Sequence, residues 1–272
     1  MRERPDAAAE GILLAGAGRA ILLQLADPAV GYGVARHSDF ARNPMARLHG
    51  TLMYVYAVMT GTPGDRAAAA AFVDRRHAPV SGPTPGETGV PRYDARDPAL
   101  QLWVAATLYD TATLVAERVL GPLPAADADR LYRRYAALGT ALQVPDDLWP
   151  ADRAAFRAYW DRAVAGLAVN DVVRAQVDAL FRATAAPPWV RALMPVMRFL
   201  TAELLPERVA ALYGLTPNER HRRRARVLWR AVAALYGVLP SGVRTWPSRY
   251  YLARLRRLSR ASASASSSAP RD

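Results

Sequence analysis

The chain has 272 residues and is 51% hydrophobic, which is enough for one large domain with a substantial core. It contains no cysteine, so disulfides and thiolate metal sites are excluded. Its formal net charge is +12, and arginine is the only cation that contributes to it. The segment 217–260 holds twelve arginines and one acidic residue, so the remainder of the chain is close to neutral.

The N-terminal region shows no pattern of a targeting or membrane-spanning segment. The first ten residues, MRERPDAAAE, are charged, and the apolar run that follows is interrupted by Arg19 and Gln24. No stretch of the chain reaches the roughly 18 uninterrupted apolar residues of a membrane span. We therefore expect a cytoplasmic protein.

Helix-start signals recur along the chain. Four N-cap residues stand directly before proline: Asn43-Pro44, Thr62-Pro63, Asp97-Pro98 and Thr216-Pro217. Proline suits the first helical position because its missing N–H would be unpaired there anyway. With the hydrophobic periodicity, these signals predict helices over 9–26, 44–60, 63–77, 98–120, 125–142, 150–168, 171–184, 188–204, 206–213, 217–237 and 248–258. Alternating strand patterns are absent, so the sequence predicts an all-α domain over residues 1–260.

Two segments are predicted to be non-helical. The loop 78–97 holds four prolines and three glycines, and it is too long for a simple connector. It is therefore a candidate functional loop. The C-terminal segment 261–272, ASASASSSAPRD, is of low complexity and is predicted to be a disordered tail.

The predicted helix 44–60 carries two polar residues beside an apolar face. Arg47 and Thr51 are four residues apart and therefore share a face that adjoins the apolar stripe. An arginine at that margin is costly unless an anion meets it, so we expect Arg47 to be buried and paired with an anion. The alternative is a surface arginine whose charged end extends into water.

His77 is one of four histidines and stands in the last turn of the predicted helix 63–77. The helix dipole favours its cationic form, whereas Arg75 and Arg76 favour the neutral form. A neutral imidazole has a lone pair free for a metal ion. On its pattern alone, His77 is either a metal ligand or an ordinary capping or packing residue. No pair of histidines has metal-ligand spacing.

One face of the predicted helix 98–120 carries Trp103, Thr107, Asp110 and Thr111. Asp110 either pairs with Arg47 or faces water. Trp103 is a candidate for the wall of a pocket, as are Tyr54 and Tyr109. Core packing is the other interpretation for each of these three aromatic residues.

Four stretches of the chain stand in an order that resembles one known family. They are GAGRAILLQLADPAVGYGVARHSDFARNPMARLHGT, RRHAPVSG, YDARDPALQLWVAATLYD and LPSGVRTWPSRY. They resemble the MpaB-type oxygenase family, which shares its domain with the latex-clearing rubber oxygenases, over roughly residues 10–255. The resemblance implies an all-helical domain that encloses a hydrophobic pocket for one haem b. It also implies O₂-dependent cleavage of an isoprenoid-like double bond.

The resemblance further implies roles for particular residues. His77, with Val80 and Gly82, matches the family's H-x-x-V-x-G motif and would be the proximal iron ligand. Arg47 and Thr51 match its R-x-x-x-T motif and would line the distal or propionate side, as catalytic and cofactor-binding residues. The remaining expected cofactor contacts are Arg76, Trp103 and Thr107.

The chain departs from the family at three positions. Rubber oxygenases place a lysine just before the motif threonine as a distal ligand, where this chain has Gly50 and no lysine anywhere. Many members read W-V-H-A-T in the tryptophan helix, where this chain has Ala105 in place of the histidine. Asp27 also stands where relatives often have histidine. These departures leave catalytic activity open.

Three functions follow as hypotheses. The first is a haem b-dependent oxygenase that acts with O₂ on a hydrophobic, unsaturated substrate. The second is a non-catalytic haem-binding or lipid-binding helical protein, because of Ala105 and Asp27. The third is nucleic-acid binding, suggested by the net charge of +12, and it ranks low because no known nucleic-acid module is present.

The basic segment 217–260 also suggests a peripheral contact with an anionic membrane, at the inner membrane surface. Tyr251, Leu252, Leu255 and Leu258 recur at helical spacing with arginines between them, as in an interfacial amphipathic helix. The alternative is that these apolar residues belong to the domain core while the arginines form a solvated face.

Overall fold

Capping residues mark helix starts in the structure as they do in the sequence. Thr62 Oγ1 accepts a hydrogen bond from the Asp65 amide at 3.2 Å, and the Asp65 carboxylate accepts one from the Thr62 amide at 2.9 Å. This capping box begins α4 (Pro63–His77). The Asp97 carboxylate likewise accepts from two backbone amides at the start of α5 (Pro98–Leu120).

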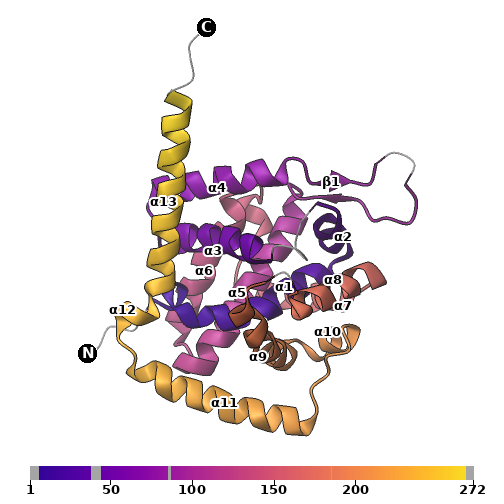
Figure 1. Ribbon diagram of the computed structural model, residues 1–272, viewed down its shortest axis with the longest axis vertical. Coiled ribbons are helices and arrows are strands. Elements are labelled where there is room, and N and C mark those ends of the chain that lie inside the picture. Colours follow the sequence, from indigo (N-terminus) through magenta and orange to yellow (C-terminus); the bar gives the residue numbers. More distant parts are fainter. Residues whose placement is uncertain (1–5, 38–43, 85–86, 185, 268–272) are drawn as a thin grey trace.

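The structure is a computed structural model that describes residues 6–37, 44–84, 87–184 and 186–267 (Figure 1). Its helices are η1 (Ala7–Ala9), η2 (Gly11–Gly16), α1 (Ala17–Ala26), α2 (Pro28–His37), α3 (Pro44–Thr60), α4, α5, α6 (Ala125–Thr140), η3 (Asp146–Leu148), α7 (Arg153–Gly166), α8 (Asp171–Arg182), α9 (Pro188–Leu204), α10 (Glu207–Leu212), α11 (Glu219–Val238), α12 (Ser241–Arg244) and α13 (Trp246–Ser267). The predicted all-α fold is confirmed, and β1 (Ser81–Gly82) and β2 (Tyr93–Asp94) add a two-residue antiparallel ladder within the loop 78–97.

Helix α2 was not among the helices predicted from the sequence. Its two glycines weaken the helical signal, but Asp27 Oδ1 accepts hydrogen bonds from the amides of Ala29 and Val30 at 2.9 and 3.0 Å and begins the helix. Gly31 is needed where α2 packs closely on its neighbours. A Cβ there would lie 2.6 Å from Val173 Cγ2, so tertiary packing offsets the low helix propensity.

The C-terminal helix is longer than predicted. The sequence analysis ended this helix at residue 258 and expected a disordered tail over 261–272. The structure continues α13 to Ser267, and residues 268–272 lie outside the described part. Adding residues to an existing helix avoids the cost of nucleation, and alanine is the best helix former, so the alternating alanines allow the extension.

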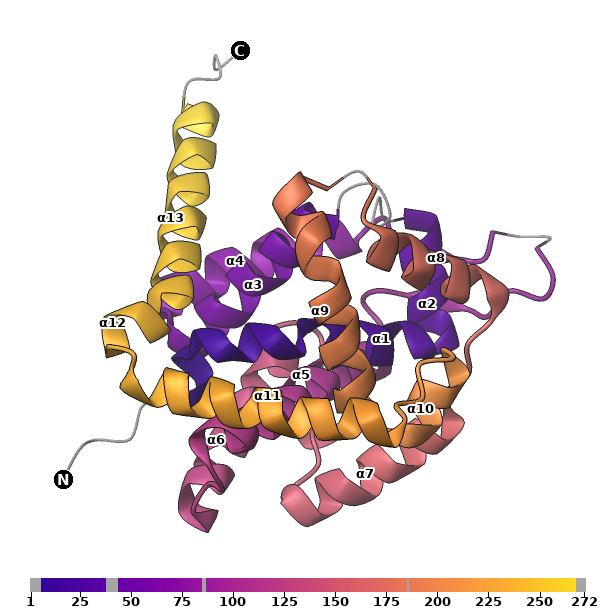
Figure 2. The same cartoon turned by 60° about the horizontal axis from the view of Figure 1, so that its bottom comes forward.

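The long helix α5 and the shorter helix α1 lie at the centre of the arrangement. α5 packs against η2, α1, α6 and α11, while α1 packs against α2, α5 and α9. α3 lies between α4, α6 and α13. Figures 1 and 2 show α13 along one side of the molecule and α11 along the adjoining edge. Arg256 ties α13 to α4, because its guanidinium donates to both oxygens of the Asp65 carboxylate at 2.9 and 2.7 Å.

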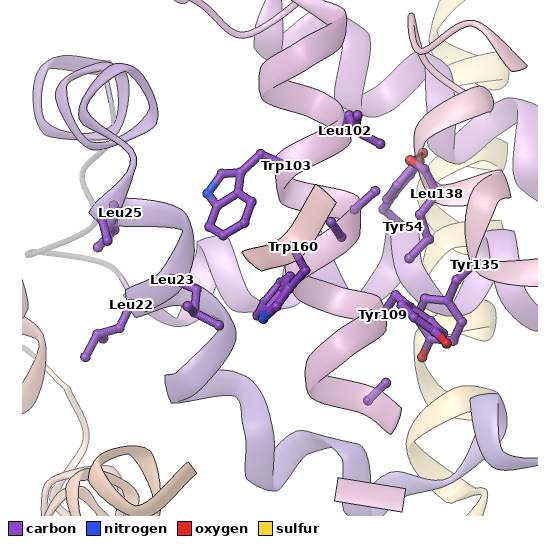
Figure 3. Close-up of a cluster of buried hydrophobic side chains, with 14 of the residues drawn as sticks. Leu22, Leu23, Leu25, Tyr54, Leu102, Trp103, Tyr109, Tyr135, Leu138 and Trp160 are labelled. Carbon is purple, nitrogen blue, oxygen red and sulfur yellow. Dashed lines mark hydrogen bonds between the residues drawn. The ribbon is translucent and has the colours of Figure 1, made fainter. Parts of the chain in front are cut away.

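Aromatic side chains fill much of the core beside α5 (Figure 3). Tyr109 meets Phe156 edge-on with ring centroids 4.8 Å apart, and Trp103 lies 5.5 Å from Trp160. Edge-to-face and offset pairs of this kind stabilise a core beyond their buried area. Trp103 and Tyr109 therefore have the packing role that was the alternative interpretation for both.

Among the residues that the structure describes, no single helix has the length and apolar composition of a membrane span. The segments Gly11–Ala26 and Pro28–His37 meet those criteria only as a pair, and the chain bends by 103° between them.

Candidate functional site

A pocket of about 520 Å³ lies beside His77, and we call it the His77 pocket. Helices α2, α3, α4 and α5 and the β1–β2 segment contribute to its walls. The loop 78–97 is thus part of the site, through Val80, Tyr93 and Asp94. Pockets of about 300–1,000 Å³ are typical of small-molecule and cofactor sites.

His77 is the last residue of α4 and lines this pocket. Its Nδ1 atom is buried and has no hydrogen-bond partner among the residues that the structure describes. Burial, and then the charge of Arg47, lower the pKa of His77 below its ordinary value, so the ring is neutral at neutral pH. A buried, neutral imidazole nitrogen without a partner is costly unless something binds it.

The other three histidines have partners. His37 is hydrogen-bonded to Tyr93 Oη at 3.1 Å, and His49 to Tyr251 Oη at 2.8 Å. His221 Nε2 lies 3.0 Å from the Phe199 carbonyl oxygen. In the described part of the chain, no group of three or more acidic or histidine side chains could hold a metal ion.

A second pocket, of about 210 Å³, lies on the other side of α3 and α1, and we call it the apolar pocket. Its walls come from η2, α1, α3, α5, α8 and α9, and they are mostly aliphatic side chains and methionines. The residues that line both pockets are Gln24, Arg47, Thr51 and Leu108. These four form a partition between the two pockets.

Arg47 and Thr51 are one turn apart on α3, as the sequence predicts, and both belong to the partition. Burial lowers the pKa of Arg47 to about 10, and it still remains cationic at neutral pH. Asp110, which was one candidate partner for Arg47, is bound elsewhere: its Oδ2 accepts from Arg19 Nη2 at 2.6 Å. Neither alternative for Asp110 included Arg19, because sequence spacing does not reveal that α1 and α5 are adjacent.

Arg19 is held by bonds that join three helices. Besides Asp110, it donates to Thr111 Oγ1 at 2.6 Å and to the Leu204 carbonyl at 2.8 Å. Its side chain lines neither pocket. Arg19 is therefore a structural residue. In the sequence it stood out only as an interruption of an apolar run.

The remaining predicted cofactor residues divide between the pocket and the core. Arg76 lines the His77 pocket, and its guanidinium lies 4.8 Å from the centre of the Phe72 ring. Trp103 lines neither pocket. Thr107 is fully buried, and its Oγ1 accepts from Gln24 Nε2 at 3.0 Å. Thr107 thus holds Gln24 in the partition, a residue that the sequence showed only as a polar interruption of a helix.

The three positions that depart from the family motifs differ in whether they line the His77 pocket. Gly50 and Ala105 both line the His77 pocket. A Cβ at Gly50 would meet only Phe72 Cε1 at 3.8 Å, an ordinary van der Waals distance. Asp27 caps α2 and lines neither pocket. Two of the three departures therefore remove side-chain functional groups from the pocket wall.

Comparison with known proteins confirms the resemblance seen in the motifs. Residues 5–235 match the family described as "ER-bound oxygenase mpaB/B'/Rubber oxygenase, catalytic domain". The uncharacterized protein Rv2237 of Mycobacterium tuberculosis is 34% identical over 238 residues, which cover 85% of this chain and 91% of that protein. The uncharacterized protein Mb2261 of Mycobacterium bovis matches to the same extent. No solved structure matches the chain significantly.

Proposed function

This chain belongs to the family of mpaB and rubber oxygenase catalytic domains, and from that premise we propose that it is a haem b-dependent oxygenase of a hydrophobic, unsaturated substrate. The family description supports an oxygenase. The dependence on haem and the class of substrate are what we propose. The observation that carries it is the buried, unpartnered Nδ1 of His77 beside a pocket of about 520 Å³.

The residues of the His77 pocket fit haem b. A haem iron needs one axial protein ligand, and His77 is a neutral imidazole at the pocket wall. The haem propionates need cations, and Arg47 and Arg76 line the same pocket. When bound, haem b supplies an iron centre that activates O₂. The apolar side chains of the pocket would cover the macrocycle and exclude water.

The partition lies between a pocket proposed for haem and a pocket proposed for the substrate. Its Arg47 guanidinium and Thr51 hydroxyl supply hydrogen-bond donors where the two pockets meet. The apolar pocket suits a hydrocarbon chain, because such a ligand is stabilised mainly by burial of apolar surface. We propose that the substrate occupies the apolar pocket and that Arg47 and Thr51 orient its reacting end toward the His77 pocket.

A non-catalytic haem-binding or lipid-binding role is the second candidate. Gly50 and Ala105 favour it, because both line the His77 pocket without a functional side chain. The haem-binding form of this candidate differs from the oxygenase in turnover, whereas the lipid-binding form differs in haem content as well.

Absorption spectroscopy of the purified protein, oxidised and reduced, tests the haem. A Soret band that shifts on reduction supports the oxygenase and the haem-binding protein, and its absence after haem reconstitution would leave only the lipid-binding role. Oxygen consumption with isoprenoid-like alkenes, with products identified by mass spectrometry, then separates them. Thr51→Val is the informative variant: it should lower turnover while haem content stays unchanged.

The segment 217–260 remains a proposed contact with an anionic membrane surface. Its arginines supply the charge, and each basic residue near such a surface contributes about 1 kcal/mol. Tyr251 and Leu255 are buried, so they are not free to enter a bilayer. Exposed Trp246 and Tyr250 are the apolar residues that this segment offers at the start of α13.

A further inference from the structure

The N-terminal half of α9 exposes large apolar side chains. Trp189, Leu193 and Val196 are 65%, 44% and 45% exposed. Their spacing of four and three residues places them on one face of the helix. Contiguous apolar surface on a water-soluble domain commonly marks a site of contact with a partner or a membrane.

The neighbouring face of the same half-helix lines the apolar pocket. Val190, Met194 and Met197 are among its lining residues, together with Leu180 and Phe181 of α8. This part of α9 therefore separates the apolar pocket from the outside and is apolar on both sides.

The C-terminal half of α9 is anchored in the protein. Phe199 stacks on His221 of α11 with ring centroids 4.1 Å apart. Trp229 of α11 donates its indole N–H to Glu203 at 3.0 Å. Figure 2 shows the other end of α9 extending away from α11 toward the edge of the molecule. We call the exposed face formed by Trp189, Leu193 and Val196 the apolar stripe. The helix that carries this stripe is held in place by the contacts of its C-terminal half.

The charges around the stripe favour an anionic surface. Arg191 and Arg198 are exposed on α9, and Arg182 is exposed at the end of α8. The segment 188–198 contains no acidic residue. Tryptophan prefers the membrane–water interface, and arginines beside an apolar stripe bind anionic headgroups.

From this arrangement we propose that the N-terminal half of α9 docks on an anionic lipid bilayer and that the apolar pocket receives its ligand from that bilayer. The proposal that α9 docks on the bilayer is based only on the exposed surface of α9 and does not depend on the oxygenase function. The role of the pocket as a substrate site rests on the proposed oxygenase function. A second copy of this chain is the competing occupant of the stripe.

Vesicle co-sedimentation of the full-length protein tests the docking. The probes are phosphatidylcholine vesicles with and without phosphatidylglycerol, at low and high salt. The variant is Trp189→Ser, Leu193→Gln and Val196→Gln combined, at exposed positions that line neither pocket. We expect the wild type to bind vesicles that contain phosphatidylglycerol, and the variant to lose about tenfold or more in partitioning, because three large apolar side chains no longer leave water.

The matched control variant replaces Val238→Gln, Val243→Gln and Trp246→Ser, which are exposed apolar positions of α11, α12 and α13 within the segment 217–260, the other proposed membrane contact. If α9 is the main docking surface, this variant should lose less vesicle binding than the α9 variant. The proposal is overturned if the wild type does not bind. It is also overturned if only the control variant loses binding, or if the wild type is a dimer that the α9 variant converts to a monomer without any vesicle binding.

Activity measurements separate this proposal from the proposed function. The α9 variant should keep its haem spectrum and should turn over a detergent-solubilised alkene at the wild-type rate. It should turn over the same alkene more slowly when the alkene is embedded in vesicles. If no haem binds while vesicle binding still depends on α9, the oxygenase proposal fails and the docking proposal stands.

Discussion

The His77 pocket and the apolar pocket share a partition but are built from different parts of the helices. The His77 pocket includes two helix ends, His37 and His77, and the β1–β2 segment. The apolar pocket is lined mainly by the inner faces of helices such as α1, α3 and α9. Helix ends carry polar and charged residues that serve their unpaired backbone groups, whereas inner faces are apolar. The difference in polarity between two adjacent pockets thus follows from their positions along the helices.

Among the substitutions considered, removal of the His77 imidazole should have the largest effect, and this effect should be confined to the His77 pocket. In His77→Ala, haem retention should fall by more than the roughly 10–100-fold that is typical when an outer partner of a metal ligand is removed. Far-UV circular dichroism should be unchanged, because His77 is at the end of α4. His49→Ala is the control, since His49 lines neither pocket. Full haem occupancy with an unaltered spectrum in His77→Ala would rule out its assignment as ligand.

Two arginines of the central helices should respond differently to substitution. Arg19→Met leaves Asp110 without its partner, and breaking such a buried pair costs about 3–5 kcal/mol of unfolding free energy. The protein that remains folded should bind haem normally. Arg47→Met should instead weaken haem binding, because Arg47 lines the His77 pocket. Urea denaturation and haem titration measure the two effects, and a reversed pattern would contradict the assigned roles.

Filling each pocket separately should uncouple the two sites. Ala17 lines only the apolar pocket and Ala29 only the His77 pocket. Ala17→Phe should weaken binding of diphenylhexatriene by about tenfold and leave the Soret band unchanged. Ala29→Phe should reduce haem uptake and spare the fluorescent probe. Each substitution should cost about 1–3 kcal/mol through overpacking. Equal losses of both ligands in both variants would show that the pockets act as one.

Removal of the hydrogen bond between Thr107 and Gln24 should have the smallest effect on stability. Thr107→Val removes the acceptor of the Gln24 amide and should destabilise the protein by about 1–3 kcal/mol. The control is Thr201→Val on α9, whose hydroxyl donates only to the Met197 carbonyl of its own helix. Denaturation midpoints compare the two variants. A Thr107→Val effect no larger than that of the control would show that Gln24 needs no support.

Local signals in the sequence predicted most helices and the candidate ligand His77. Capping residues and proline placed the starts of α3, α4 and α5 correctly, whereas the signal Thr216-Pro217 missed the start of α11, which begins at Glu219 with Asn218 as its N-cap. The same local reasoning singled out His77 at a helix end and Arg47 with Thr51 on one face. Such features depend on residues within one or two turns, so a linear pattern contains them.

Features that depend on distant residues were not predictable in this way. α2 forms despite two glycines because it packs tightly on α8. Trp103 and Thr107 share a face of α5, yet one packs in the aromatic core and the other holds Gln24. Only the positions of the neighbouring helices distinguish these roles.

The sequence by itself determined the all-α fold, the family and the candidate ligand, because periodicity, capping and motif order are local properties of the chain. Tertiary structure alone decided the pairing of Asp110 with Arg19, the partition between two pockets and the exposure of the stripe on α9. Each of these depends on which helix faces lie against one another. The apolar residues of α9 read alike in the sequence, but Met194 lines a pocket while Trp189 faces outward.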